Sequence, residues 1–199
     1  IDNNDLCSLT SAVTSPEFTT DRLWLNGKEE DVANAKRLKV VLSQVRSRCT
    51  DEALKSQKIH IVSANSFPTA AGLASSAAGL AALTLALATL LQVKDTYPGE
   101  LTTICRMGSG SSCRSLQGGL VEWVMGERED GTDSVGVQRA PASHWPLDMT
   151  ILVANAGKKH TSSTSGMQNS IKTSTLMEHR VQNVVQKRLA RITQVTDFS

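Results

Sequence analysis

Several segments of the chain alternate apolar and polar residues, a spacing that predicts β-strands because successive side chains point to opposite faces. The clearest is Lys58–Asn65, and Arg22–Gly27 also alternates before it ends in Asn-Gly, which is typical of a hairpin turn. Other strands are predicted at Leu9–Val13, Gly118–Gly126, Ser134–Ala140 and Met149–Asn155. We expect Ser134–Ala140 to pair antiparallel with the strand that precedes it.

Apolar residues three and four positions apart predict an amphipathic helix over Glu29–Cys49, with an acidic start and a basic end. A second helix is predicted over Leu73–Leu91. Its apolar part, Ala77–Leu91, would be about 22 Å long at ~1.5 Å per residue, and a bilayer core needs about 30 Å. It is therefore read as a buried core helix. Further helices are predicted at Leu101–Met107, Ser165–Thr173 and Thr175–Thr196.

The order of these elements indicates the fold class. Strands and helices mix without a regular β-α-β alternation, which favours a layered α+β domain over a doubly wound sheet. The 199 residues are enough for one domain or for a large part of a two-domain protein. We expect a first domain over residues 1–173 and the beginning of a second over residues 174–199.

Composition narrows the range of partners. Lys and Arg number 21 and Asp and Glu 19, a net charge of +2, which argues against nucleic acid or an anionic membrane as the main partner. Any anion must be bound by a local arrangement. Cys7, Cys49, Cys105 and Cys113 lack the spacing of a zinc site or a disulfide framework and predict reduced thiols.

A loop of small residues, Phe67-Pro-Thr-Ala-Ala-Gly-Leu-Ala-Ser-Ser-Ala-Ala-Gly79, runs directly into the apolar helix. Gly72 can adopt backbone angles that other residues avoid, and Ser75 and Ser76 place hydroxyls where a helix start leaves N–H groups without partners. With the positive end of the helix dipole, these groups predict a polyphosphate site. It is not a P-loop, because no Gly-Lys-Ser/Thr follows. A serine N-cap or a tight helix–strand contact is the alternative.

A second glycine- and serine-rich segment is Arg106-Met-Gly-Ser-Gly-Ser-Ser-Cys-Arg-Ser-Leu-Gln-Gly-Gly119. Ser109 and Ser111 offer hydroxyls, and Arg114 stands where a short helix is expected to begin. Its planar guanidinium can bind a phosphate or a carboxylate at two points, so the segment predicts a site for an acidic small molecule. A flexible linker with a solvated arginine is the alternative.

A third candidate is Lys158-Lys-His-Thr-Ser-Ser-Thr-Ser-Gly-Met167, where a solvated basic loop is an equal alternative. No supporting constellation makes His60, His144 or His160 a catalytic base, and no His/Cys metal cluster is evident. Two anion-binding loops on one domain imply two acidic ligands held close together. Phosphoryl transfer needs that arrangement, because it is largely positioning and charge neutralisation.

Three further motifs stand beside the two anion loops: Asp21-Arg-Leu-Trp-Leu-Asn-Gly27, Gly118-Gly-Leu-Val-Glu-Trp123 and Ser162-Ser-Thr-Ser-Gly-Met167. Together the five motifs resemble the mevalonate diphosphate decarboxylase family, and the resemblance covers most of the chain from about Leu9 onward. Gly-Leu-Ala-Ser-Ser-Ala-Ala alone indicates only the wider GHMP small-molecule kinase superfamily. Gly-Ser-Gly-Ser-x-Cys-Arg-Ser with the downstream Glu-Trp is much more specific.

The resemblance implies an ATP- and Mg²⁺-dependent carboxy-lyase of isoprenoid and sterol biosynthesis. In that family the 3-hydroxyl of mevalonate 5-diphosphate is phosphorylated, and phosphate then leaves as CO₂ departs, giving isopentenyl diphosphate. The implied fold is GHMP-kinase-like (ribosomal S5 domain 2-like), with a left-handed βαβ unit, layered sheet and helices, and a second domain largely absent from this chain. A cytoplasmic homodimer is also implied, with no nucleic-acid or membrane partner.

The resemblance also assigns roles by motif position. The ATP phosphates would be lined by Gly72, Leu73, Ala74, Ser75 and Ser76. The substrate diphosphate would contact Ser109 and Ser111, and Ser163 from the third loop. Arg114 would hold the substrate carboxylate and orient it for loss of CO₂.

Two parts of the family pattern are missing. The family has an early Lys-Tyr-Trp-Gly-Lys stretch and a catalytic Asp within Asp-Ala-Gly-Pro-Asn, and neither is found here. We therefore expect an incomplete chain that is inactive by itself. Two other functions stay open: a sister kinase, such as one acting on phosphomevalonate, and a non-catalytic module that binds an acidic metabolite.

Overall fold

The computed structural model describes residues 6–68, 73–146, 150–152 and 161–196. The chain divides into two compact units, Ile1–Ala156 and Gly157–Ser199. This division falls ahead of the boundary predicted at 173–174, and the assignment of 174–199 to a second domain stays a prediction. None of the helices in the described ranges has the length and apolar character that crossing a bilayer requires.

A four-stranded mixed sheet forms one side of the first unit. Its strands, in order across the sheet, are β1 (Ser8–Ser15), β4 (Lys58–Asn65), β2 (Arg22–Leu25) and β3 (Lys28–Glu30). β4 pairs antiparallel with β1 and parallel with β2, and β2 and β3 form a hairpin. Asn26 and Gly27 have φ angles of 50° and 80°, the left-handed backbone of a tight hairpin turn. The hairpin predicted at this Asn-Gly is confirmed.

The parallel pairing of β2 and β4 requires a crossover, which α1 (Lys36–Arg48) and α2 (Glu52–Ser56) supply. This connection is a βαβ unit of the kind that the resemblance implies, and its hand stays a prediction. α1 begins later than predicted. Glu29 belongs to β3 because the Asn-Gly turn folds residues 28–30 back onto β2, so the helix has no acidic first turn.

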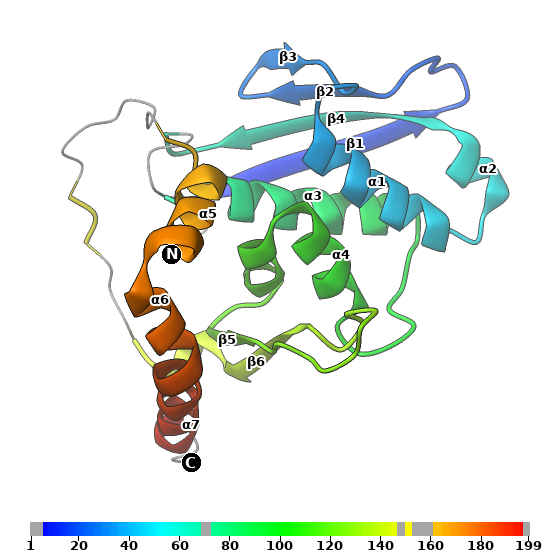
Figure 1. Ribbon diagram of the computed structural model, residues 1–199. Coiled ribbons are helices and arrows are strands. Elements are labelled where there is room, and N and C mark those ends of the chain that lie inside the picture. The colour runs from blue at the N-terminus through cyan, green and yellow to red at the C-terminus, as the bar shows by residue number, and fades with distance from the viewer. Residues whose placement is uncertain (1–5, 69–72, 147–149, 153–160, 197–199) are drawn as a thin grey trace. The chain divides into compact units, whose positions relative to one another are not determined.

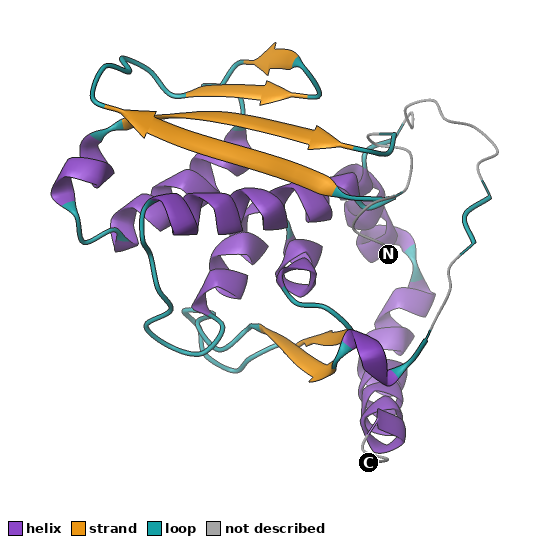
Figure 2. Ribbon diagram, turned by 180° about the vertical axis from the view of Figure 1, so that it is seen from behind, coloured by secondary structure: helices purple, strands orange, loops and turns teal. Residues whose placement is uncertain are grey.

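Helices lie between two sheets in this unit. α1 and α3 (Ser75–Leu90) cover one face of the four-stranded sheet, and α4 (Glu100–Gly108) lies on their other side (Figure 1). The hairpin of β5 (Leu120–Trp123) and β6 (Gly136–Ala140) forms the far layer (Figure 2). The predicted layered α+β architecture is confirmed, as is the antiparallel pairing of β5 with β6.

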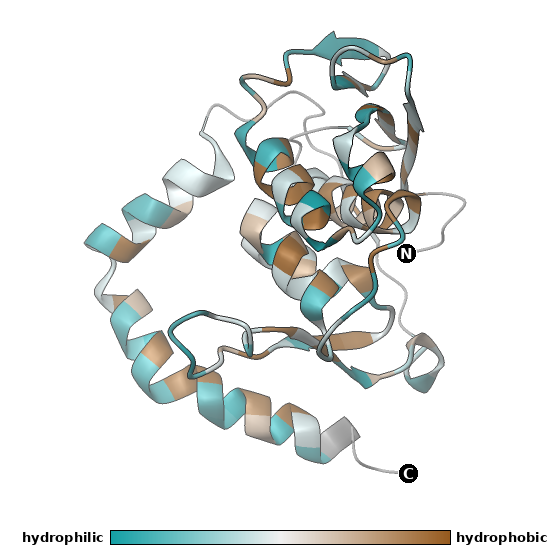
Figure 3. Ribbon diagram, turned by 90° about the vertical axis from the view of Figure 1, so that its right-hand side faces the viewer, coloured by the Kyte–Doolittle hydropathy of each residue, from teal (hydrophilic) through white to brown (hydrophobic). Residues whose placement is uncertain are grey.

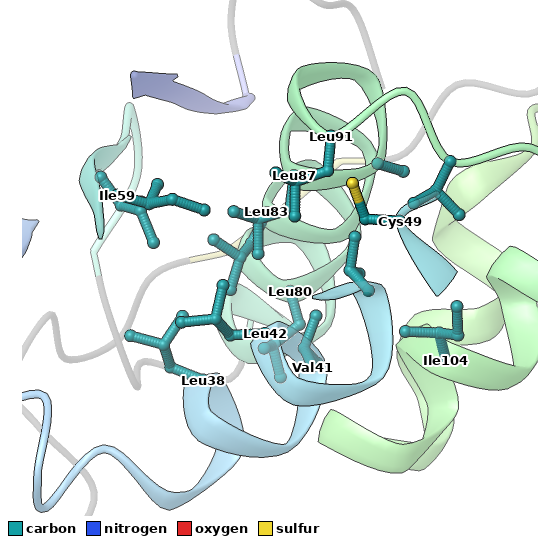
Figure 4. Packing of buried hydrophobic residues seen from close by; sticks show 14 of the residues in the cluster. Leu38, Val41, Leu42, Cys49, Ile59, Leu80, Leu83, Leu87, Leu91 and Ile104 are labelled. Carbon is teal, nitrogen blue, oxygen red and sulfur yellow. The ribbon is translucent and has the colours of Figure 1, made fainter. Parts of the chain in front are cut away.

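The hydrophobic core joins α1, α3, α4 and β4 (Figure 4). α1 buries one stripe at the predicted three- and four-residue spacing, Leu38, Val41, Leu42 and Val45. α3 is apolar along its length and buries one broad face, which includes Leu80, Leu83 and Leu87. The predicted core helix is therefore confirmed, and its start at Ser75 places the first anion loop at the edge of the core.

Two short 3-10 helices, η1 (Gly110–Leu116) and η2 (Ala142–His144), complete this unit. The strand predicted over Gly118–Gly126 is shorter, because it forms ladder pairs with β6 only at Leu120–Trp123. Residues 150–152, within the strand predicted at Met149–Asn155, are not in a strand, and the rest of that segment lies outside the described residues.

The second unit is helical over its described residues. It contains α5 (Ser163–Thr173), α6 (Thr175–His179), the π-helical turn Arg180–Val184 (η3) and α7 (Val185–Thr196). The π-helical turn interrupts the single helix predicted over Thr175–Thr196. Apolar and polar positions alternate around these helices (Figure 3), and apolar side chains such as Ile171, Leu176 and Ile192 are exposed.

Candidate functional site

The first anion loop leads into the uncapped start of α3. Ala74 is the N-cap residue, with φ 54° and ψ 30°, and its methyl side chain cannot accept a hydrogen bond from the first turn. Its carbonyl accepts from the N–H groups of Ala77 and Ala78 at 2.9 and 3.1 Å. The dipole of this 16-residue helix therefore presents partial positive charge at a start that no side chain caps.

The residues predicted to line ATP phosphates lie at this helix start. Ser75 and Ser76 are the first two residues of α3, half-buried and exposed respectively. Leu73 is half-buried and Ala74 is exposed. Gly72 lies outside the described residues, so its predicted backbone role is untested.

A cavity of about 870 Å³ opens onto the same helix start. The β2–β3 hairpin, the first turn of α1, the end of β4 and the first two turns of α3 surround it. Its polar wall includes Asn26, Lys28, Lys36, Asn65, Ser75 and Ser76. Its apolar wall includes Leu23, Leu38, Leu80 and Leu83. A cavity of this size, with a helix N-terminus at one edge and lysines in its wall, has the volume and charge for a nucleotide.

The hairpin side of the cavity is held by hydrogen bonds to β4. Asn26 donates its N–H to the Ser63 carbonyl at 2.9 Å, and its side-chain oxygen accepts the N–H of Asn65 at 2.9 Å. The Ser63 hydroxyl lies 2.8 Å from that of Thr10 on β1. The Asn-Gly pattern predicts the turn at Asn26 but not its place in a cavity wall. The basic residues Lys28 and Lys36 around the hairpin were the available signal.

The second anion loop is built differently. Ser112, at its centre, is fully buried, and its hydroxyl donates to the Cys105 carbonyl at 2.7 Å. The same hydroxyl accepts the Cys105 thiol at 3.1 Å and also bonds the Ser109 carbonyl. Ser112 therefore fastens the loop to α4, whereas Ser109 is half-buried and Ser111 exposed. Unlike Ser112, the two serines predicted to bind substrate are therefore not buried.

Arg114 does not begin a helix, which corrects the prediction. It lies within η1, a 3-10 helix that starts at Gly110, because the Ser112 bonds tighten the chain before it. The side chain is exposed, and its guanidinium carbon lies 6.0 Å from the centre of the Trp123 ring. Among the described residues no carboxylate pairs with it. Between Met107 and Gly119 the positive charge comes from that side chain, since the guanidinium of Arg106 donates to the Gly131 carbonyl.

The two loops belong to packed elements but do not share the cavity. α3 and η1 contact each other. A Cβ built on Gly108 would lie 3.3 Å from Leu80, and Leu80, one turn after Ser76, also lines the cavity. Ser109, Ser111 and Arg114 are not among the residues that line it. Their joint action with the first loop stays a prediction.

Ser163 begins α5 in the other unit. The preceding residue, Ser162, caps that helix by accepting the N–H of Ser165 at 3.1 Å. This hydroxyl is thus used in the fold, and the substrate contact predicted for Ser163 is untested. Lys158 and His160 of the same segment lie outside the described residues.

Two carboxylate–arginine pairs fix the scaffold around the loops. Burial alone would raise the pKa of Asp21, but Arg46, at 2.7 and 2.9 Å, and the N–H of Ile59 hold that pKa below its usual value. Burial alone would likewise raise the pKa of Glu100, but hydrogen bonds from Arg48 and Thr96 outweigh burial and hold that pKa below its usual value. Both carboxylates are ionised at neutral pH and hold helices in place.

The four cysteines form no disulfide, as predicted. Burial raises the pKa of the Cys105 and Cys113 thiols, which keeps them protonated and unreactive. Within the described residues, no group of three or more His, Cys, Asp or Glu side chains is placed to hold a metal ion.

Comparison with known proteins finds similarity to a single family in both the N-terminal and the C-terminal part of the chain. Residues 1–136 match the family model "Diphosphomevalonate decarboxylase-like N-terminal domain", and residues 149–198 match "Mevalonate 5-diphosphate decarboxylase C-terminal domain". The diphosphomevalonate decarboxylase of Schizosaccharomyces pombe is 46% identical over 198 residues, which are 95% of this chain and 50% of that protein. The chain thus spans about half the length of the curated relatives it matches.

Two solved structures extend the similarity to the fold. A crystal structure of mevalonate 5-diphosphate decarboxylase matches with a TM-score of 0.83 and 44% identity, over 98% of this chain and 52% of that chain. The structure described as MDDEF in complex with MVAPP, AMPPCP and magnesium matches with a TM-score of 0.73 and 30% identity, over 96% and 57%.

Proposed function

Because this chain belongs to the diphosphomevalonate decarboxylase family, we propose that it forms the nucleotide- and substrate-binding part of an ATP-dependent decarboxylase. The substrate is mevalonate 5-diphosphate and the product isopentenyl diphosphate. The 3-hydroxyl is phosphorylated first. The C–O bond to that phosphate and the C–C bond to the carboxylate then break, and the electron pair of the C–C bond forms the new double bond.

The cavity at α3 is the proposed nucleotide site, and it is the observation that carries the proposal. Its volume of about 870 Å³ suits a nucleoside triphosphate, and Lys28 and Lys36 add positive charge to its wall. In this proposal the N-terminus of α3 binds the phosphates, and the hydroxyls of Ser75 and Ser76 bind them or a phosphate-bound Mg²⁺. When bound, the nucleotide supplies the phosphoryl group and Mg²⁺ neutralises its charge.

The second loop is the proposed substrate site. Ser109 and Ser111 present hydroxyls to the diphosphate, and Arg114 binds the carboxylate through its planar guanidinium. A carboxylate held in one orientation loses CO₂ along a fixed direction, so the contribution of Arg114 is alignment before the C–C bond breaks. Ser163 is proposed as a further diphosphate contact.

A product assay on the full-length protein that carries this chain tests the proposal. ATP and mevalonate 5-diphosphate should give ADP, phosphate, CO₂ and isopentenyl diphosphate in equal amounts. Mevalonate 5-phosphate, which lacks one phosphoryl group, is the matched control and should react far more slowly. Release of ADP without CO₂ would instead indicate a kinase, and binding of both ligands without any turnover would indicate a binding module.

Assembly and location follow the family resemblance. We propose a homodimer in the cytoplasm, acting in isoprenoid and sterol biosynthesis. Sedimentation of the full-length protein at micromolar concentration should give twice the monomer mass, and a tagged protein should fractionate with the cytosol. A monomer, or recovery with organelles, would remove the corresponding part of this proposal.

A further inference from the structure

Trp123 is fixed in orientation by the β5–β6 hairpin. It is the last residue of β5, and its ring N–H donates to the Ser134 hydroxyl at 3.0 Å. Ser134 is buried and donates in turn to the Val124 carbonyl at 3.0 Å. A tryptophan ring has one N–H, so a bond to a buried hydroxyl sets the direction in which the ring points.

The ring lies directly against the second anion loop. A Cβ built on Gly110 would lie 2.9 Å from the Trp123 ring atom Cη2 and 3.2 Å from Cζ3. Only a residue without a side chain allows this approach of loop backbone to ring. The carbonyl of Gly110 also accepts the Cys113 thiol at 3.1 Å, so the ring supports the turn from which Arg114 projects.

The same ring faces the guanidinium of Arg114, 6.0 Å from its centre. That distance is at the outer range of a cation–π contact, which attracts a positive charge to the ring face. Arg114 is exposed, and an arginine otherwise samples many rotamers that binding must restrict. A neighbouring ring that favours one region of space lowers this loss of entropy when a ligand binds.

The hairpin and the loop are joined at a second point. The N–H of Gly136 on β6 donates to the Thr102 hydroxyl on α4 at 2.9 Å. A Cβ on Gly136 would lie 2.5 Å from the Cys113 carbonyl oxygen, so β6 and η1 are in backbone contact. The position of Trp123 under the loop is therefore set by the fold.

We propose that Trp123 is a positioning residue that holds the turn at Gly110, and through it the guanidinium of Arg114, ready for the carboxylate of the ligand. This inference rests on the proposed function, because that function assigns the carboxylate to Arg114. Trp123 acts on the carboxylate end alone, so its removal separates two ligands that share a diphosphate and differ in the carboxylate.

Calorimetry on the full-length protein tests the proposal with mevalonate 5-diphosphate and isopentenyl diphosphate, which lacks the carboxylate. Trp123→Leu should weaken binding of the first ligand about threefold to fivefold more than binding of the second. Trp123→Phe keeps an aromatic ring but loses the bond to Ser134, so its selectivity should lie between those of Trp123→Leu and the wild type. Trp24→Leu is the matched control, since it removes an indole that lies 4.6 Å from Arg22 on the other sheet, and should leave the selectivity unchanged.

Three outcomes would overturn the proposal. Equal weakening of both ligands by Trp123→Leu indicates only a structural role. Selectivity that Trp123→Leu leaves unchanged would also reject the positioning role. So would a loss of selectivity on Trp123→Leu that persists in the Arg114→Ala background. If Trp123→Leu does not fold, Ser134→Ala, which removes the partner of the ring N–H, should lower the same selectivity, and unchanged selectivity in a folded Ser134→Ala protein rejects the proposal. Both measurements are of binding, so absent turnover in the wild-type protein rejects the proposed function and leaves this test decisive.

Discussion

The two anion loops of the first unit use similar residues but obtain their positive charge from different sources. The loop before α3 relies on the backbone, because it opens onto the uncapped start of a 16-residue helix beside a cavity. The loop before β5 ends in a 3-10 helix of seven residues and relies on the side chain of Arg114, which a neighbouring ring supports. Serine and glycine content alone does not distinguish a backbone site from a side-chain site.

The comparison predicts opposite responses to mutation. A site made of backbone N–H groups keeps its charge when a side chain is trimmed, whereas a site that depends on one guanidinium loses its charge with that residue. Mutations in the first loop should therefore change the binding of ATP, and mutations in the second loop should change the binding of the carboxylate-bearing substrate.

Arg114→Ala should have the largest effect. Loss of the guanidinium removes the alignment of the carboxylate, and we expect kcat of the full-length protein to fall about 100-fold or more with the KM for ATP nearly unchanged. Steady-state kinetics with both substrates check this. Arg128→Ala is the control, because Arg128 pairs with Asp130 in an exposed turn; equal losses in both variants would contradict the role given to Arg114.

Glu100→Gln should loosen the scaffold of the second loop only. Glu100 is buried at the start of α4 and pairs with Arg48, so the change should lower the free energy of unfolding by about 3 kcal/mol. Its pKa is lowered in the folded protein, so the stabilisation is present above the unfolded pKa of about 4.3 and is lost as pH falls through the folded value.

Denaturation with urea between pH 3 and pH 7 measures both effects of this change. Wild-type stability should fall more steeply on acidification than that of Glu100→Gln, while ATP affinity at pH 7 stays the same in the two proteins. Parallel pH curves would show that the ion pair contributes no acid sensitivity.

Gly110→Ala should act on the contact between loop and ring. The added methyl would lie 2.9 Å from Trp123, and overpacking of this kind costs about 1 to 3 kcal/mol. We expect kcat/KM for mevalonate 5-diphosphate to fall about tenfold. Gly118→Ala is the matched control from the same motif, since its Cβ would make an ordinary contact of 4.0 Å with Ala142. A larger loss in Gly118→Ala would refute the explanation.

Ser76→Ala should have the smallest effect. The helix start keeps its backbone N–H groups, so removing one hydroxyl should raise the KM for ATP only about threefold, the range of a single hydrogen bond. ATP titration of the variant measures this. A 100-fold rise would mean that the first loop, too, depends on a side chain, and the contrast between the loops would disappear.

Local patterns predicted most of the elements. Lys58–Asn65 matches β4 residue for residue, because strict alternation and a half-buried sheet specify one register. The spacing of apolar residues predicted the buried stripe of α1. It did not predict where the helix begins, because Glu29 pairs with β2 in a hairpin. Predictions failed where a distant partner, here a strand, decided the structure.

The sites show the same limit. The hydroxyls of both loops were recognisable, yet only the folded chain distinguishes Ser112, which is buried and fastens the loop, from Ser111, which is exposed. The contact of Gly110 with Trp123 joins residues thirteen positions apart. The hairpin wall of the cavity joins three elements. Neither feature has a local pattern that could have predicted it.

Leu80 forms part of two walls at once, since it lines the cavity and also packs against Gly108 at the start of the second loop. A larger side chain at this position would crowd both neighbours, and a smaller one would leave a void shared between them. The packing of the cavity and the packing of the second loop thus both depend on the size of one aliphatic side chain. Natural variants of this chain should therefore keep the size of residue 80 far more strictly than that of Leu85, whose side chain on the same helix is exposed.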